Sequence, residues 1–238
     1  MLILFDIDRT LLETRGVGMV CLQDAGRSLF GDHLSVEGIE FGGRLDLLII
    51  GDILERAGVI PSPENIRAMR AAYAERLALA LDSGATSTAL AGTHQLVDAL
   101  GDMAEVTLGL LTGNFEETGR LKLGAAGFDI ERFPVRVWGD DSPHFPPVRD
   151  HLPPIGIERH AALKGVRLSP DQVVIIGDTI HDVSCALAHG CRVLAVATGH
   201  NSAAELAAAG AHRVVKDLSR TGDILAWLTE PTRPNAIA

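Results

Sequence analysis

Two aspartates, Asp6 and Asp8, stand one residue apart directly after an apolar run at residues 2–5. An apolar run of this length that ends in charge predicts a buried strand of a parallel sheet, and open α/β sheets place their chemistry at the carboxyl ends of such strands. Because side chains alternate along a strand, we expect both carboxylates to lie on the same side. Carboxylates this close repel each other unless a cation or a shared proton lies between them. The pair therefore predicts a metal site, a proton-transfer site, or both.

A second acidic pair, Asp178 and Asp182, follows another apolar run at residues 173–176 and the turn residue Gly177. The pattern of buried strand and terminal carboxylates recurs, with Asp182 in the first turn of the helix expected to follow. Clusters of carboxylate oxygens suit a hard cation, and Mg²⁺ typically takes one or two carboxylates together with substrate phosphate and water. We therefore expect Mg²⁺ as the cofactor.

A third apolar run, residues 106–111, ends in Thr112, Gly113 and Asn114. A hydroxyl and a glycine turn before a helix supply hydrogen-bond donors for an anion, and the helix N-terminus strengthens the attraction. Taken singly, each of the three motifs also has a structural interpretation, as an N-cap, an Asx turn or a strand-to-helix turn. Their joint occurrence at three strand ends favours a catalytic site.

The stretches Phe-Asp-Ile-Asp-Arg-Thr-Leu, Leu-Leu-Thr-Gly-Asn and Ile-Gly-Asp-Thr-Ile-His-Asp resemble motifs one, two and four of the haloacid-dehalogenase-like (HAD) hydrolases. The resemblance covers most of the chain and is nearest to the phosphoglycolate phosphatase and β-phosphoglucomutase branch. It implies that Asp6 is a nucleophile that forms an aspartyl-phosphate. Asp8 would be the general acid for the leaving alkoxide and then the general base for water. Thr112, with the backbone N–H groups near Gly113 and Asn114, would bind the phosphoryl oxygens.

The resemblance also implies the metal ligands. Mg²⁺ would lie between Asp6, the backbone carbonyl of Asp8, and Asp178, and would neutralise charge that otherwise repels the nucleophile from the phosphate. Asp182 would bind the metal through water or orient the other ligands.

The basic residue of motif three, usually a lysine that pairs with the nucleophile and the phosphate, is missing from its familiar Lys-Pro setting. Arg149, shortly before a helix expected from residue 154, is our candidate, because a guanidinium clamps phosphate with two parallel bonds. Lys122 and Lys164 are the alternatives, although Lys122 is expected on a solvated helix face. Arg9 stands where the family usually carries glycine, and its cation either reaches a substrate anion or points to solvent.

Within the segment between motifs one and two, Gly42-Gly43-Arg44-Leu45-Asp46 resembles the Gly-Arg-Thr-Asp stretch of related phosphatases, which faces the active site. Arg44 would then bind a second anionic group of the substrate, a carboxylate or a phosphate. Asp46 suits a first-turn helix acid equally well.

Composition restricts the function classes. The chain has 238 residues, of which 47% are hydrophobic and 22% charged, enough for a core domain with a smaller insertion. A net charge of −10 argues against binding to nucleic acid or to an anionic membrane, because phosphate-rich partners recruit basic patches. The three cysteines form no C-x-x-C pair, and the N-terminal apolar run lacks a preceding basic region, so we expect a cytoplasmic protein without a signal peptide.

Hydrophobic periodicity predicts an α/β fold, a doubly wound parallel sheet with a smaller inserted α-helical cap. Helical spacing dominates the segment between motifs one and two, a location that marks a substrate-selecting cap in the family. From residue 93 onward strands and helices alternate. We therefore assign residues 1–14 and 91–238 to the α/β core and residues 15–90 to the cap, and we expect a frayed tail from Thr229.

The resulting hypothesis is a Mg²⁺-dependent hydrolase that removes phosphate from a small phosphorylated metabolite. A sugar phosphomutase shares the aspartyl-phosphate and is the main alternative. Neither the substrate nor the oligomeric state follows from the sequence. A phosphoacceptor signalling domain is less favoured, as is a dehalogenase, since Asp8 stands where dehalogenases lack the acid/base aspartate.

Overall fold

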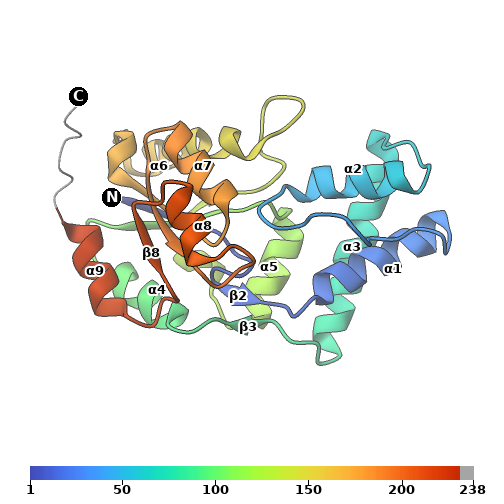
Figure 1. Cartoon of the computed structure of the whole chain (residues 1–238), viewed down its shortest axis with the longest axis horizontal. Coiled ribbons are helices and arrows are strands. Elements are labelled where there is room, and N and C mark those ends of the chain that lie inside the picture. The colour runs from blue at the N-terminus through green and yellow to red at the C-terminus, as the bar shows by residue number, and fades with distance from the viewer. Residues whose placement is uncertain (231–238) are drawn as a thin grey trace.

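The computed structural model describes residues 1–230 and contains a six-stranded, wholly parallel sheet (Figure 1). The spatial order of its strands is β5-β4-β1-β6-β7-β8. Starting from β1, the chain adds β4 and β5 on one side and then β6, β7 and β8 on the other. The strands are β1 (Leu2–Phe5), β4 (Thr107–Leu111), β5 (Val135–Val137), β6 (Val173–Gly177), β7 (Arg192–Val196) and β8 (Arg213–Val215). This arrangement confirms the predicted doubly wound α/β fold, and it brings the three motif-bearing strands, β4, β1 and β6, next to one another.

Helices cover both faces of the sheet, because each strand has apolar side chains on both sides. Ile3 and Phe5 of β1 belong to one buried cluster, and Leu2 and Leu4 belong to the other. The first cluster is closed by α4 (Thr93–Gly101), α5 (Glu116–Ala125) and α9 (Thr221–Thr229), and the second by α6 (Leu152–Lys164), α7 (Ile180–Ala188) and α8 (Ala203–Ala208). Short 3-10 helices lie at Ile130–Arg132, Arg149–His151 and Pro170–Gln172.

A helical insert interrupts the core after β1. It begins and ends at a two-stranded antiparallel ribbon of β2 (Leu12–Glu13) and β3 (Thr88–Ala89). Between these strands lie α1 (Val17–Phe30), α2 (Asp46–Arg56) and α3 (Pro63–Asp82), which Figure 1 shows beside the sheet, at the end away from α9. The insert has its own apolar cluster, which also receives Phe115 from the start of α5. The insert is therefore packed against the residue that follows motif two.

Most predicted elements are present, with boundaries shifted by a few residues. α6 begins at Leu152 rather than at residue 154, and α9 was not among the predicted elements. Of the predicted frayed tail, residues 231–238 lie outside the described residues. The cysteines at 21, 185 and 191 are buried and unpaired. Within residues 1–230, no helix combines the length and the apolar character that crossing a membrane requires.

Candidate active site

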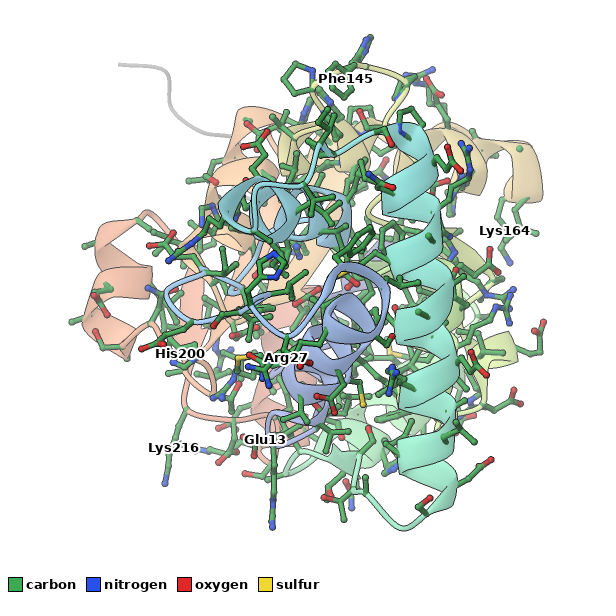
Figure 2. All side chains as sticks on the ribbon, turned by 90° about the vertical axis from the view of Figure 1, so that its right-hand side faces the viewer. Glu13, Arg27, Phe145, Lys164, His200 and Lys216 are labelled. Carbon is green, nitrogen blue, oxygen red and sulfur yellow. The ribbon has the colours of Figure 1, made fainter. Side chains whose placement is uncertain are left out.

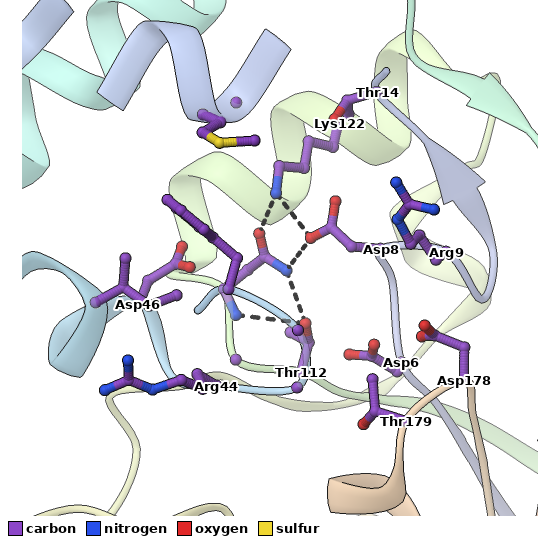
Figure 3. A pocket seen from close by; sticks show the side chains of 18 of the residues that line it. Asp6, Asp8, Arg9, Thr14, Arg44, Asp46, Thr112, Lys122, Asp178 and Thr179 are labelled. Carbon is purple, nitrogen blue, oxygen red and sulfur yellow. Dashed lines mark hydrogen bonds and ion pairs between the residues drawn. The ribbon is translucent and has the colours of Figure 1, made fainter. Parts of the chain in front are cut away.

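A cavity of about 190 Å³ lies where the carboxyl ends of β1, β4 and β6 meet the helical insert (Figure 3). The core contributes the residues of all three motifs to its walls, and the insert contributes residues of α1, α2, α3 and the segment before α2. The core residues that line it include Asp6, Asp8, Arg9, Thr112, Gly113, Asn114, Lys122, Arg149, Asp178, Thr179 and His200. This position agrees with the rule that open α/β sheets bind ligands beyond the carboxyl ends of their strands.

Three buried carboxylates, those of Asp6, Asp178 and Asp182, lie close together, and the first two line the cavity. One oxygen from each lies within 4.8 Å of the other two. Burial raises the pKa of Asp6 to about 7, with Arg149 opposing the shift and the carboxylates of Asp182 and Asp8 adding to it. Burial, followed by the charges of Asp182 and Asp6, raises the pKa of Asp178 well above its usual range. Three carboxylates this close need positive charge, and the cluster thus fits a cation.

Arg149 supplies part of that positive charge. Its Nη2 lies 2.5 Å from Oδ1 of Asp182 and 3.1 Å from Oδ1 of Asp6. Both Nη atoms also donate to main-chain carbonyls, those of Gly43 at 3.3 Å and Leu111 at 3.4 Å. Burial alone lowers the pKa of Arg149, but the carboxylates of Asp182 and Asp6 raise it, so that the guanidinium stays charged. The structure thus brings the motif-three candidate into contact with the predicted nucleophile.

The remaining carboxylate oxygens show which residues fit a metal ion. Both oxygens of Asp182 are already bonded, Oδ1 to Arg149 and Oδ2 to the hydroxyl and N–H of Thr179 at 2.6 and 3.0 Å. Oδ1 of Asp178 accepts from Thr10 at 3.1 Å. Within residues 1–230, no hydrogen bond reaches Oδ2 of Asp6 or Oδ2 of Asp178. The free oxygens of Asp6 and Asp178 therefore fit direct ligands, whereas Asp182 fits an orienting role; an all-oxygen set suits Mg²⁺.

The loop after β4 offers donors for an anion. Thr112 Oγ1 accepts hydrogen bonds from the backbone N–H of Asn114 at 3.3 Å and from its Nδ2 at 2.8 Å, so its own hydrogen is free to donate into the cavity. The N–H of Asn114 is thus used inside the loop. The N–H of Gly113, in contrast, has no hydrogen-bond partner within the described part of the chain. Of the three residues predicted to bind the phosphoryl oxygens, Thr112 and Gly113 therefore keep a donor free for an anion.

The prediction that Lys122 lies on a solvated helix face is wrong. Its side chain is 7% exposed, and Nζ donates to Oδ2 of Asp8 at 2.8 Å and to Oδ1 of Asn114 at 2.6 Å. Burial lowers the pKa of Lys122, but Asp8, Tyr73 and Asp46 raise it, and the net pKa lies above the usual range. One feature of the sequence could have indicated that Lys122 is buried. It follows Phe115 by seven residues, so the two side chains lie on the same face of the helix.

The other predicted cations have less central positions. Arg44 lines the cavity, but its guanidinium pairs with Asp52 of α2 at 2.7 Å, and Figure 3 shows it pointing away from Asp6. Arg9 has a left-handed φ of 58°, a backbone conformation that favours glycine. It lies at the cavity with Glu13 3.8 Å away. Lys164 ends α6 on the exposed surface, and Figure 2 shows it projecting outward.

Asp46 joins the insert to the core. It lies in the first turn of α2, as predicted, but its carboxylate also accepts from the N–H of Phe115 at 3.4 Å. Burial raises the pKa of Asp46 to about 6, while Lys122 opposes this shift. The residue therefore lines the cavity from the insert side and contacts the loop after β4.

Comparison with known proteins adds a family context to this geometry. A family model described as HAD-hydrolase-like matches residues 156–221, which contain β6, α7 and the acidic residues Asp178 and Asp182. No protein with curated function matches the sequence significantly.

Several solved structures share the fold over nearly the whole chain. A hydrolase from Pseudomonas syringae has a TM-score of 0.70 at 21% identity, covering 95% of this chain and 97% of that chain. A predicted phosphoglycolate phosphatase from Haemophilus somnus has a TM-score of 0.69 at 20% identity, covering 95% and 96%. CbbY from Rhodobacter sphaeroides, solved with phosphate, has a TM-score of 0.69 at 22% identity, covering 93% and 96%; a variant of it was solved with xylulose-(1,5)bisphosphate. At these identities the likeness shows the fold.

Proposed function

We propose, from the premise that the chain has the fold and the motifs of the haloacid-dehalogenase-like hydrolases, that it is a Mg²⁺-dependent phosphomonoesterase. Its substrate would be a small phosphorylated metabolite, bound in the cavity between the sheet and the helical insert. The observation that supports this proposal best is the meeting of four groups at one cavity: the carboxylate of Asp6, the free oxygen of Asp178, the guanidinium of Arg149 and the hydroxyl of Thr112.

Asp6 would act as the nucleophile. One of its oxygens forms a bond to phosphorus while the bond from phosphorus to the leaving oxygen breaks, and the product is an aspartyl-phosphate. Water then attacks the same phosphorus and releases inorganic phosphate, restoring Asp6. Arg149 holds Asp6 through a 3.1 Å contact and offers a cation near the incoming phosphoryl group.

Asp8 would move the proton in both steps. It donates a proton to the leaving alkoxide, so that an alcohol departs, and it later takes one proton from the attacking water. Its carboxylate lies at the cavity but outside the cluster of Asp6, Asp178 and Asp182. This separation suits a proton carrier, and only the backbone carbonyl of Asp8 remains as its predicted metal ligand.

Thr112 and the N–H of Gly113 would bind the phosphoryl oxygens, and Asn114 would hold Thr112 in place. Mg²⁺, when bound to Asp6 and Asp178, supplies positive charge that lets two anions approach each other. Asp182 would hold Arg149 and Thr179 in place beside Asp6 and Asp178.

We assign residues 15–90 to a cap and residues 1–14 and 91–238 to the core. The ribbon of β2 and β3 supports this division, because it carries the chain into and out of the insert at those positions. Arg44 stays a proposed contact for a second substrate anion, which would have to compete with Asp52 for the guanidinium.

The test is phosphate release from a panel of phosphorylated metabolites, measured with Mg²⁺ and with chelator, for the wild type and for Asp6→Asn. Release that needs Mg²⁺ and is lost in the variant would support the proposal. Release that persists in Asp6→Asn would exclude Asp6 as the nucleophile. Conversion of a sugar phosphate to its isomer without phosphate release would favour the sugar phosphomutase, in which the same aspartyl-phosphate returns its phosphoryl group.

A further inference from the structure

Lys122 is a second buried cation in the candidate site, and it contacts different groups from Arg149. Arg149 holds Asp6 and Asp182. Lys122 holds Asp8 and Asn114, and Figure 3 shows the dashed line from Lys122 to Asp8. Lysine is rarely buried unless it is paired. The pairing of one cation with each catalytic aspartate suggests two separate tasks.

The chemistry of the ammonium group fixes the orientation of its neighbours. A lysine ammonium can only donate, so the amide group of Asn114 must present its oxygen to Nζ, which lies 2.6 Å away. The amide nitrogen of Asn114 then faces the other way and donates to Oδ2 of Asp8 and to Oγ1 of Thr112, both at 2.8 Å. Lys122 thereby determines which end of Asn114 meets Asp8.

The two donors converge on one oxygen of Asp8. Oδ2 accepts from Nζ of Lys122 at 2.8 Å and from Nδ2 of Asn114 at 2.8 Å. Within residues 1–230, no hydrogen bond or ion pair reaches Oδ1 of Asp8. Because the side chain of Asp8 is 39% exposed at the cavity, Oδ1 is the oxygen available to a bound substrate.

We propose that Lys122 is a positioning residue that holds Oδ2 of Asp8, directly and through Asn114, so that Oδ1 faces the leaving oxygen of the substrate. This inference rests on the proposed function, in which Asp8 carries the proton. It separates the two cations: Arg149 serves the nucleophile, and Lys122 serves the acid/base residue.

A residue that acts through Asp8 has a characteristic kinetic effect. Alkyl phosphates expel a basic alkoxide and need a proton in the transition state, whereas 4-nitrophenyl phosphate expels a weakly basic phenolate and needs little help. Loss of a well-placed general acid costs about 100-fold or more on the first kind of substrate. A residue that binds the phosphoryl group, in contrast, affects both kinds equally.

The experiment compares Lys122→Met, Lys122→Arg, Asp8→Asn and the double variant Lys122→Met/Asp8→Asn. Each is assayed on the best alkyl phosphate of the metabolite panel and on 4-nitrophenyl phosphate. Lys216→Met, which removes an exposed lysine by the same substitution, is the matched control. Thermal unfolding of each variant checks that it is folded.

We expect Lys122→Met to lower kcat/KM about 100-fold on the alkyl phosphate and less than about 5-fold on 4-nitrophenyl phosphate. This ratio reports the steps up to departure of the leaving group and excludes hydrolysis of the aspartyl-phosphate, which both substrates share. The double variant should be no slower than Asp8→Asn alone, because both changes remove one function. Lys122→Arg should recover part of the loss, since a guanidinium also donates to Oδ2. Lys216→Met should match the wild type.

Equal losses on both substrates, or losses that multiply with those of Asp8→Asn, would overturn the inference and make Lys122 a phosphate-binding residue. Unchanged kcat/KM on the alkyl phosphate in Lys122→Met would overturn it as well. If Lys122→Met does not fold, the same comparison is made with Lys122→Arg, whose small, leaving-group-dependent loss the inference requires. Failure of the proposed function is distinguishable, because then the wild type itself releases no phosphate from either substrate.

Discussion

The backbone N–H of Asp46 donates a 2.8 Å hydrogen bond to the carbonyl oxygen of Gly113. This bond joins the helical insert to the loop after β4, so the insert meets the candidate phosphate-binding loop main chain to main chain. A side chain at position 113 has no room, because a Cβ there would overlap the carbonyl oxygen of Arg44 and lie 3.3 Å from Cα of Leu45. The position of the insert and the shape of the loop are therefore coupled.

Gly113→Ala should separate the helical insert from the loop after β4. Because the obstructing atom belongs to the backbone, the methyl group must displace either the insert or the loop, at a cost of about 1–3 kcal/mol in the free energy of unfolding. We expect kcat/KM for phosphate release to fall by about 100-fold, since a displacement near 1 Å misaligns the reacting groups. Gly124→Ala in α5 is the control: nothing lies within 4 Å of a Cβ there. It should keep full activity, and equal behaviour of the two variants would refute the coupling.

Arg149→Met should damage both stability and activity. It leaves Asp6 and Asp182 buried without their guanidinium, and removal of one partner from a buried ion pair typically costs about 3–5 kcal/mol. Arg149→Lys keeps the charge but cannot span both carboxylates, so we expect an intermediate result. Urea unfolding and phosphate release, both in Mg²⁺ buffer, measure the two effects. A fully active Arg149→Met would exclude this residue as motif three.

Much of the core could be predicted because its signals are local. Each motif-bearing strand is a short apolar run ended by a polar residue, and these runs correspond to β1, β4 and β6 within one or two residues. Parallel strands that lie side by side bring their carboxyl ends to one edge, so the meeting of Asp6, Thr112 and Asp178 follows from the sheet alone.

Residues whose roles depend on tertiary packing were harder to predict. Lys122 belongs to a helix that is poor in apolar residues and contains two glycines, so the inward face was ambiguous and lysine suggested solvent. The partner of Arg44 is Asp52, and this pairing depends on the path of the non-helical chain between α1 and α2. Lys122 contacts Asp8, which is far away in the sequence, and Arg44 reaches Asp52 from an irregular loop.

Asp178→Asn should reveal the metal site without any assay of activity. Burial and neighbouring carboxylates raise the pKa of Asp178, so its charge destabilises the metal-free protein at neutral pH. With chelator present, we expect the variant to unfold at a higher temperature than the wild type. A ligand at 100 times its Kd stabilises by about 2.7 kcal/mol, so Mg²⁺ should raise the Tm of the wild type and leave the variant nearly unchanged. Asp24→Asn, at an exposed position in α1, should respond to Mg²⁺ like the wild type. Equal Mg²⁺ shifts in all three proteins would argue against Asp178 as a ligand.

Asp46→Asn should make stability less dependent on pH. The folded-state pKa of Asp46 is about 6, raised by burial, against about 3.9 in an unfolded chain. Between these values the folded protein binds more protons than the unfolded one, so the stabilising contribution is complete below about pH 4 and is lost as the pH rises through 6. The asparagine keeps the shape but does not titrate.

The variant should therefore be more stable than the wild type at pH 7, and this advantage should disappear near pH 4. A shift of this size corresponds to about 3 kcal/mol in full burial, but water in the cavity screens the charge, and we expect about 1 kcal/mol. Urea unfolding of both proteins at several pH values between 4 and 7, with chelator present, measures the difference. Titration of the acidic cluster is common to both proteins and cancels, and Asp24→Asn again serves as the control. A difference that stays constant across this range would show that the Asp46 carboxyl is not the titrating group.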